Sequence, residues 1–141
     1  MLCRDVMKTS PHSVRATDSV QNAAKKMRDQ NIGFLPVCDG GNKVIGTITD
    51  RDIALRCVAA GRATTSPIEA FMTRGAVSCL PTDDIAKAHA LMGQHKKSRM
   101  MCCDEDGTLL GVISLSDMAT LTDGPAIMNT LRQVVTREVR A

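Results

Sequence analysis

The sequence predicts an α/β (α+β) protein made of two copies of one β-α-β-β-α unit. First, positions 7–53 align without a gap on positions 72–118, and eleven of these 47 pairs are identical, against about three expected at average residue usage. Second, turn residues and apolar periods follow in the same order in both copies. A unit of about 50 residues buries too little surface to fold alone. We therefore expect the copies to pack sheet to sheet about a pseudo-two-fold axis.

Each copy begins with a short extended piece and a helix. The extended pieces are expected at residues 13–16 and 77–80. The helices open with good capping residues, Thr17-Asp18 in one copy and Thr82-Asp83 in the other. Their apolar residues recur at the helical period, namely Val20, Ala23, Ala24 and Met27 in the first copy, and Ile85, Ala88, Leu91 and Met92 in the second.

Two strands and a last helix complete each copy. The strands are separated by turns rich in glycine and short acids, at residues 39–42 and 104–107. The last helix begins near Asp50 in the first copy and near Leu115 in the second. The strands are expected at Phe34–Cys38, Val44–Thr49, Arg99–Cys103 and Leu109–Ser114.

We expect the first copy at residues 1–60, a linker rich in small and polar residues at 61–67, the second copy at 68–122, and a C-terminal helix at 123–141. Apolar residues at helical spacing, from Ile127 to Val139, give that last helix one apolar face. This face either packs on its own body or forms a dimer contact.

Composition excludes several classes of function. Two Phe, no Tyr and no Trp, with a net charge of +3, do not favour binding to nucleic acid. No apolar run is long enough to span a bilayer and the N-terminus has no apolar signal core, so we expect a cytoplasmic protein that does not bind membranes. The six Cys lack paired spacing and, with the His residues, match no metal motif. We expect core thiols and no metal site.

One pattern carries chemistry in both copies. Gly46-Thr47-Ile48-Thr49-Asp50-Arg51-Asp52 and Gly111-Val112-Ile113-Ser114-Leu115-Ser116-Asp117 each place a hydroxyl where a strand ends and a helix begins, and an acid three residues later. The hydroxyl and the helix amides suit a phosphate, and the acid suits a ribose diol. Plain helix capping by the same residues remains an alternative.

These segments resemble the hallmark of the CBS-domain family, named for cystathionine β-synthase. Leu35-Pro36-Val37 is similar to its apolar-Pro-Val strand, and Val6-Met7 and Phe71-Met72 to its leading motif. The resemblance implies a tandem pair, or Bateman module, like the small stand-alone bacterial CBS-pair proteins. It further implies a homodimer and a regulatory module without catalysis. Such a module binds AMP, ADP or ATP in clefts between the repeats and signals to an unidentified protein partner by a change of conformation or assembly.

Transferred position by position, the resemblance implies two clefts. Arg99 falls where the family presents a phosphate-binding Arg, and Phe34 occupies the equivalent position in the other copy. We therefore expect phosphorylated ligands in cleft one, where Arg51 is a second phosphate candidate. We expect a less charged adenosine compound, or none, in cleft two. Cleft one comprises Thr49, Arg51, Asp52, Lys97, Ser98 and Arg99, and cleft two comprises Ser114, Asp117, Thr9 and the backbone of Ile32, Gly33 and Phe34.

No catalytic constellation and no obligatory cofactor are predicted. Two alternative hypotheses remain: an interaction or structural CBS pair with vestigial clefts, and a thiol- or metal-responsive stress protein. One departure from the family pattern is Met100-Met101-Cys102-Cys103, which lacks the usual proline. We expect this loss to change the strand geometry little.

Overall fold

The computed structural model describes residues 1–75, 77–119 and 124–139. The chain forms two compact units, and their limits differ from those of the sequence copies. The first unit contains His12–Ala76, and the second unit contains Val77–Ala141 together with Met1–Pro11. The beginning of the chain therefore belongs with its second half.

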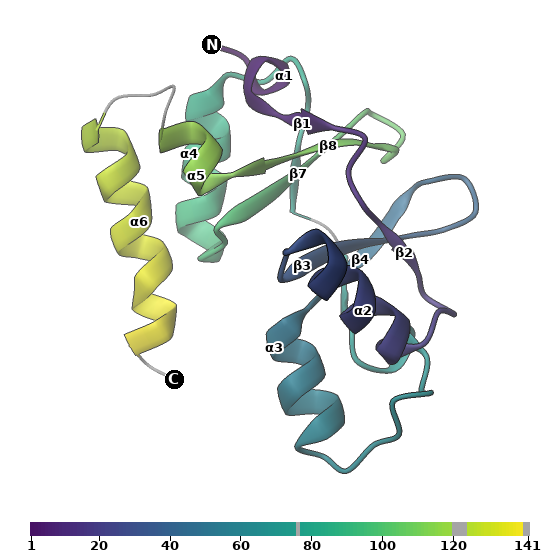
Figure 1. Cartoon of the computed structure of the whole chain (residues 1–141). Coiled ribbons are helices and arrows are strands. Elements are labelled where there is room, and N and C mark those ends of the chain that lie inside the picture. Colours follow the sequence, from purple (N-terminus) through teal and green to yellow (C-terminus); the bar gives the residue numbers. More distant parts are fainter. Residues whose placement is uncertain (76, 120–123, 140–141) are drawn as a thin grey trace. The chain divides into compact units, whose positions relative to one another are not determined.

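The first unit is a four-stranded sheet with helices, in the order β2-β3-β4-β5. Figure 1 labels β2, β3 and β4 of this sheet and the helices α2 and α3. The central strands β3 and β4 are antiparallel, and β2 runs parallel to β3. Its elements are β2 (Val14–Arg15), α2 (Val20–Gln30), β3 (Phe34–Cys38), β4 (Val44–Thr49), α3 (Asp50–Asp52), the π-helical η1 (Ile53–Val58), the 3-10 helix η2 (Ile68–Ala70) and β5 (Thr73–Arg74).

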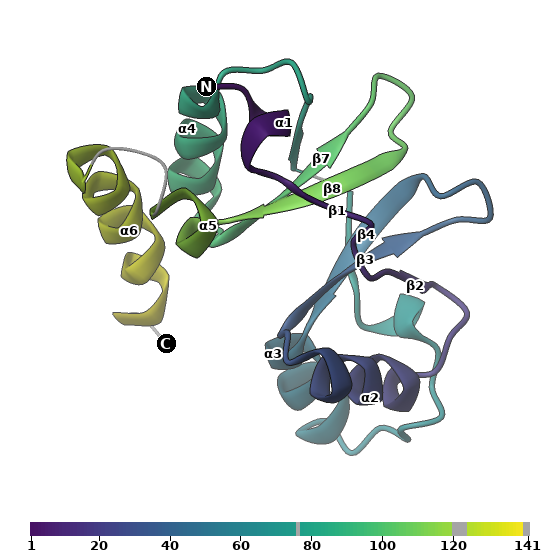
Figure 2. The ribbon, with the colours of Figure 1, turned by 45° about the horizontal axis from the view of Figure 1, so that its top comes forward.

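The second unit repeats this plan, with a sheet in the order β1-β8-β7-β6. It carries one additional helix, α6 (Gly124–Val139), which lies alongside α4 (Figure 2). The other elements are α1 (Cys3–Val6), β1 (Lys8–Thr9), β6 (Ser78–Cys79), α4 (Ile85–His95), β7 (Arg99–Cys103), β8 (Leu109–Ser114) and α5 (Leu115–Ala119). The mixed α+β architecture predicted from the repeat is confirmed.

The two central hairpins have the same register. Phe34 lies opposite Thr49, and Arg99 lies opposite Ser114. Both hairpins also carry a register irregularity just before the last residue of the first strand. The prediction that the missing proline in β7 changes the strand geometry little is therefore confirmed, because β7 keeps the burial pattern of β3 as well.

Each sheet is completed by a segment from the other sequence copy. We call residues 1–9 and 66–74 the leading segments, because each lies at the start of its copy in the chain. β1 pairs with β8 in the second unit, and β5 pairs with β4 in the first. The Val20 amide donates to the Ser66 carbonyl at 2.9 Å, and the Ile85 amide donates to the Met1 carbonyl at 2.9 Å. These equivalent bonds, 65 residues apart, satisfy amides at the start of α2 and α4.

Apolar side chains of the sheets and helices form a core in each unit. Phe71, from a leading segment, joins the core of the first unit, and Cys3 and Val6 join that of the second. The first core also contains Val14, Val20, Ala23, Met27, Leu35, Val37, Ile48, Cys57, Ile68 and Met72. The second core also contains Cys79, Ile85, Ala88, Met92, Met100, Cys102, Ile113, Leu115 and Met118.

The residues that cap α2 and α4 are not those that the sequence indicated. Ser19 caps α2 by accepting from the Asn22 amide at 3.1 Å, and Asp84 caps α4 by accepting from the Ala86 amide at 2.9 Å. Asp18 and Asp83 instead accept from the amides of Arg15 and Leu80, where the strand turns into the helix. The prediction was wrong by one or two residues because Asp in this position also closes a turn of its own.

One part of the α6 surface is buried and another part, with apolar side chains, is exposed. Thr130 and Val134 are buried, and α6 packs on α4. Met128, Leu131 and Val135 are exposed, so the dimer contact stays a prediction. Neither α6 nor any other helix of the described residues has the length and apolar character needed to cross a membrane.

Candidate functional site

In the first unit the predicted hydroxyl and acid meet at the corner between β4 and α3. The Asp52 amide donates to Thr49 Oγ1 at 3.1 Å, and the Thr49 amide donates to Asp52 Oδ2 at 3.0 Å. This reciprocal pair is a capping box. The capping role that the sequence left open is therefore real, and it also fixes the orientation of the Asp52 carboxylate. We call this group the Thr49–Asp52 corner.

The second unit has the same arrangement between β8 and α5, the Ser114–Asp117 corner. The Asp117 amide donates to Ser114 Oγ at 3.0 Å, and the Ser114 amide donates to Asp117 Oδ2 at 3.2 Å. The Ser116 hydroxyl lies 2.9 Å from Ser114 Oγ. The motif therefore produces the same local structure twice, with one more hydroxyl in the second unit.

Each acid also faces a cation with its other oxygen, but the two cations differ in origin. Asp52 Oδ1 lies 3.7 Å from Nε of Arg56, four residues further along the chain in η1. Asp117 Oδ1 lies 3.3 Å from Nζ of Lys8, in the leading segment. The family resemblance placed Thr9 with Asp117, but sequence reasoning missed its neighbour Lys8, because no local pattern in the sequence links residues 109 positions apart. The side chains of Asp52 and Asp117 are only 15% and 17% exposed.

These contacts change the acidity of Asp117. Burial opposes ionisation of this carboxyl, but hydrogen bonds from Ser114 and from the Lys8 ammonium outweigh burial and hold its pKa below the usual value. Asp117 is therefore an anion at neutral pH, ready to accept hydrogen bonds from a ligand.

The start of β3 and β7 lies next to the corner of its own unit. The Asp50 amide donates to the Gly33 carbonyl at 3.0 Å, and the Leu115 amide donates to the Ser98 carbonyl at 2.9 Å. The structure thus brings Ile32–Phe34 together with Thr49–Asp52, and Lys97–Arg99 together with Ser114–Asp117. Among these residues Arg51, Lys97 and Ser98 are exposed, whereas Ile32, Gly33, Phe34 and Arg99 are half-buried.

The predicted clefts combine residues of both units. Thr49, Arg51 and Asp52 belong to the first unit, and Lys97, Ser98 and Arg99 belong to the second. Their grouping around one ligand stays a prediction, as does that of Ile32–Phe34 with Ser114 and Asp117. Thr9, however, shares a unit with Ser114 and lies opposite Gly111 in the β1–β8 pair.

The paired glycines of the motif explain how the leading strands come so close. A Cβ at Gly111 would lie 2.7 Å from the Lys8 carbonyl oxygen and 2.9 Å from Met7 Sδ. A Cβ at Gly46 would overlap the Thr73 carbonyl oxygen. Glycine at both positions thus permits a close backbone approach, and the approaching neighbour is a leading strand in each case.

The cysteines form part of the cores. All six are buried thiols. Burial, aided by a hydrogen bond with Cys79, raises the pKa of Cys3 to about 12, whereas a hydrogen bond from Cys79 lowers the pKa of Cys102. Among the described residues no group of three or more His, Cys, Asp or Glu side chains is placed to hold a metal ion.

Two surface hollows lie elsewhere. One is lined by α2 side chains such as Asn22 and Lys26, and the other lies between α4 and α6 beside His89. His89 Nδ1 is 3.0 Å from the hydroxyl of the buried Thr130, a contact that joins the two helices. Neither hollow contains a residue of a hydroxyl–acid corner.

Comparison with known proteins identifies the repeated motif. The CBS domain matches the chain twice, at residues 3–58 and 68–123. The CBS domain-containing protein YhcV of Bacillus subtilis (strain 168) is 36% identical over 116 residues, which are 82% of this chain and 81% of that protein.

Solved structures share the fold. The crystal structure of Hypoxic Response Protein I with two coordinated zinc ions superposes with a TM-score of 0.80 at 26% identity, over 87% of this chain and all of that one. The CBS domain pair of protein MJ0100, solved in complex with 5′-methylthioadenosine and S-adenosyl-L-methionine, superposes with a TM-score of 0.77 at 26% identity, over 86% of this chain and 94% of that one. With the hydroxyl–acid corner repeated in each unit and the family matched twice, this chain belongs to the CBS-domain family as a tandem pair.

Proposed function

We propose that the protein is a regulatory module without catalytic activity that binds adenine nucleotides of the AMP, ADP and ATP class. The observation that carries this proposal is the pair of hydroxyl–acid corners, Thr49–Asp52 and Ser114–Asp117. In each, a capping box holds a mostly buried carboxylate in one orientation. A carboxylate held in this way can accept hydrogen bonds from both hydroxyls of a ribose.

A second observation supports the choice of ligand class. Both compounds in the MJ0100 complex contain adenosine, and that pair is 26% identical to this chain. Cations lie next to the corners, with Arg99 opposite Ser114 and Lys8 beside Asp117. A ligand that carries negative charge beyond its ribose fits such surroundings.

Signalling through such a module requires a ligand with different affinities for two states of the protein. Each leading segment is connected to the acid of one corner, directly in the second unit and through an arginine in the first. Lys8 pairs with Asp117, and Arg56, which pairs with Asp52, donates to the Phe71 carbonyl at 3.2 Å. A ligand that displaces either cation would change how a leading segment is held, and a protein partner or a second copy could detect that change.

Ligand binding by the purified chain tests the proposal. AMP, ADP, ATP, NAD and S-adenosylmethionine are each added at millimolar concentration, unfolding temperature is recorded, and calorimetry follows each shift. A ligand at about 100 times its Kd stabilises the native state by about 2.7 kcal/mol. We expect stabilisation by at least one adenine nucleotide, and loss of it in Asp52→Ala, Asp117→Ala or the double variant.

The matched control is Asp29→Ala, since Asp29 is an exposed acid on α2 that pairs with its chain neighbour Arg28 at 2.9 Å. This variant should bind like the wild type. A wild-type protein that no compound stabilises, or stabilisation that survives in the double variant, would refute the proposal and favour an interaction module with vestigial clefts.

A further inference from the structure

The two corners differ in one feature that the sequence repeat conceals. Lys8 and Thr73 occupy equivalent places, each opposite the residue that follows the motif glycine: Lys8 opposite Val112, and Thr73 opposite Thr47. Lys8 brings a positive charge within 3.3 Å of Asp117, whereas Thr73 brings none to Asp52. The difference belongs to the leading strands and not to the motif.

Lys8 has the freedom to exchange partners. Its side chain is 78% exposed while that of Asp117 is 17% exposed, so the ammonium approaches the acid from the solvent side. An ion pair of this kind is weak, because solvent screens it and holding the long stem in place has an entropic cost. The Lys8 ammonium can therefore leave Asp117 when a stronger anion arrives.

An uncharged nucleoside and a nucleotide would meet this lysine differently. The ribose of adenosine must compete with Lys8 for the Asp117 carboxylate and offers the displaced ammonium no new partner. A phosphate attached to the same ribose offers Lys8 a charge-assisted hydrogen bond in exchange. Arg99, opposite Ser114 in the same unit, adds a second positive charge close by.

Resting on the function proposed above, we infer that Lys8 is a specificity-determining residue that makes the Ser114–Asp117 corner select phosphorylated adenosine over uncharged adenosine compounds. This reverses the sequence-based expectation, which gave this corner the less charged ligand because Phe34 stands in place of an arginine. The Thr49–Asp52 corner, with Thr73 in the equivalent place, lacks this contribution.

Calorimetry with AMP and adenosine tests the role of Lys8. The full chain carries Asp52→Ala, so that binding reports on the Ser114–Asp117 corner. Lys8→Gln keeps part of the stem but removes the charge, and we expect the ratio of AMP to adenosine affinity to fall about fivefold, through weaker AMP binding. Lys8→Arg should restore most of the ratio, and raising the salt concentration should weaken AMP binding less in Lys8→Gln than in its parent.

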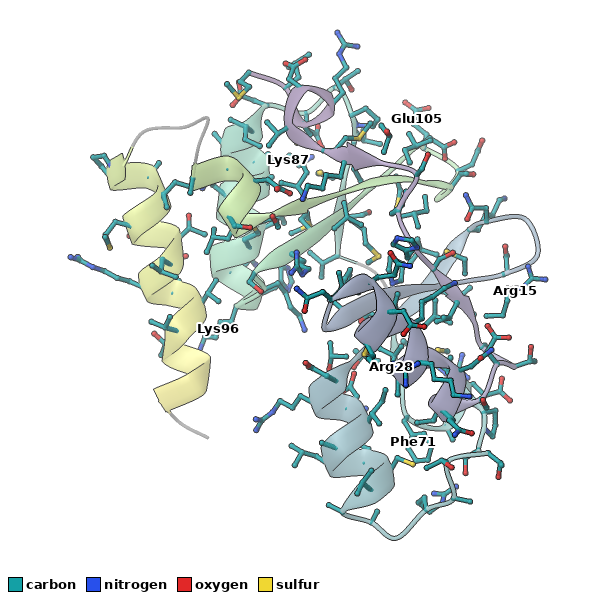
Figure 3. The ribbon with its side chains drawn as sticks, viewed as in Figure 1. Arg15, Arg28, Phe71, Lys87, Lys96 and Glu105 are labelled. Atoms are coloured by element: carbon teal, nitrogen blue, oxygen red, sulfur yellow. The ribbon has the colours of Figure 1, made fainter. Side chains whose placement is uncertain are left out.

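A second lysine of the same unit provides the control. Lys87 on α4 pairs with Asp83 at 3.4 Å and is labelled in Figure 3; Lys87→Gln should leave the ratio unchanged. The reciprocal change, Thr73→Lys in an Asp117→Ala background, should raise the ratio at the Thr49–Asp52 corner. Unfolding temperatures without ligand show whether each variant is folded.

Three results would overturn the inference about Lys8. They differ in whether the proposed nucleotide binding is refuted as well. An unchanged ratio in folded Lys8→Gln refutes the role of Lys8 and leaves the proposed function standing. Binding that Asp52→Ala abolishes refutes any selection at the Ser114–Asp117 corner, while nucleotide binding at the other corner stands. A wild-type chain that binds neither AMP nor adenosine refutes the inference and the proposed function together.

Discussion

At the scale of single residues, one acid in each unit makes two structural contacts and has one proposed role. Asp117 closes a capping box with Ser114, pairs with Lys8, and binds the ligand in the function proposed above. The first two contacts stabilise the ionised carboxylate in the folded chain, so the residue links protonation to folding. Asp52 has the same box and pairs with Arg56 instead. The structural contacts of these acids are therefore compatible with the proposed ligand binding, because the capping box orients the carboxylate that would bind.

The lowered pKa of Asp117 has a consequence for stability against pH. Because the folded pKa lies below the unfolded value of about 3.9, the carboxylate contributes stability above that value and loses it as the pH falls through the folded pKa. Asp117→Asn should lower the free energy of unfolding by about 1 kcal/mol at pH 7. The deficit should shrink below about pH 4.

Urea unfolding of both proteins at pH 7, 5 and 3 measures this effect. Asp29→Asn, at an exposed acid, should stay within about 0.5 kcal/mol of the wild type throughout. A deficit of Asp117→Asn that is as large at pH 3 as at pH 7 would contradict the linkage.

At the scale of elements, the two short leading strands complete both sheets although each has only two residues. β1 and β5 each cover the edge of a central hairpin with two residues. They can do so only because β8 and β4 carry glycine at the contact. The motif glycine thus allows the leading strand to join the sheet. In the second unit this pairing also brings Lys8 near Asp117.

Replacing the glycine of β8 tests this contact. In Gly111→Ala the new methyl group would lie 2.7 Å from the Lys8 carbonyl oxygen, which is backbone and cannot move without shifting β1. We expect a loss of about 1–3 kcal/mol in the free energy of unfolding, measured by urea denaturation. Gly40→Ala is the control, since its nearest neighbour is the flexible end of Arg15 at 3.4 Å. Equal stability of the two variants would show that β1 does not depend on Gly111.

At the scale of the whole molecule, sequence copies and folded units are offset from each other. The chain passes from one unit to the other twice, because the second unit contains both the first eleven residues of the chain and the part from Val77 onward. A change in a leading segment therefore acts on the unit in which that segment is folded. Val6 is part of the second core, and Phe71, labelled in Figure 3, is part of the first.

Cavity variants in the two leading segments should show this exchange. Val6→Ala should speed amide hydrogen exchange mainly in β6, β7 and β8, although Val6 lies in the first sequence copy. Phe71→Ala should speed amide hydrogen exchange mainly in β2, β3 and β4. It should also lower the free energy of unfolding more, by about 3–5 kcal/mol against about 2 kcal/mol for Val6→Ala. Hydrogen-exchange mass spectrometry without ligand measures both. Faster exchange confined to the sequence copy that carries each substitution would refute the exchanged arrangement.

The sequence by itself determined the repeat, the central strands and the two hydroxyl–acid motifs, because these depend on local periods and on residues within one turn of each other. The tertiary structure decided which strand lies against Gly46 and which lies against Gly111. Two leading segments with the same apolar pattern could complete either sheet, and no local signal distinguishes between them. Lys8 shows the result: its contact with Asp117 spans 109 residues and exists only because β1 pairs with β8. A charge brought to a site by a distant strand belongs to no motif, so only the folded chain reveals it.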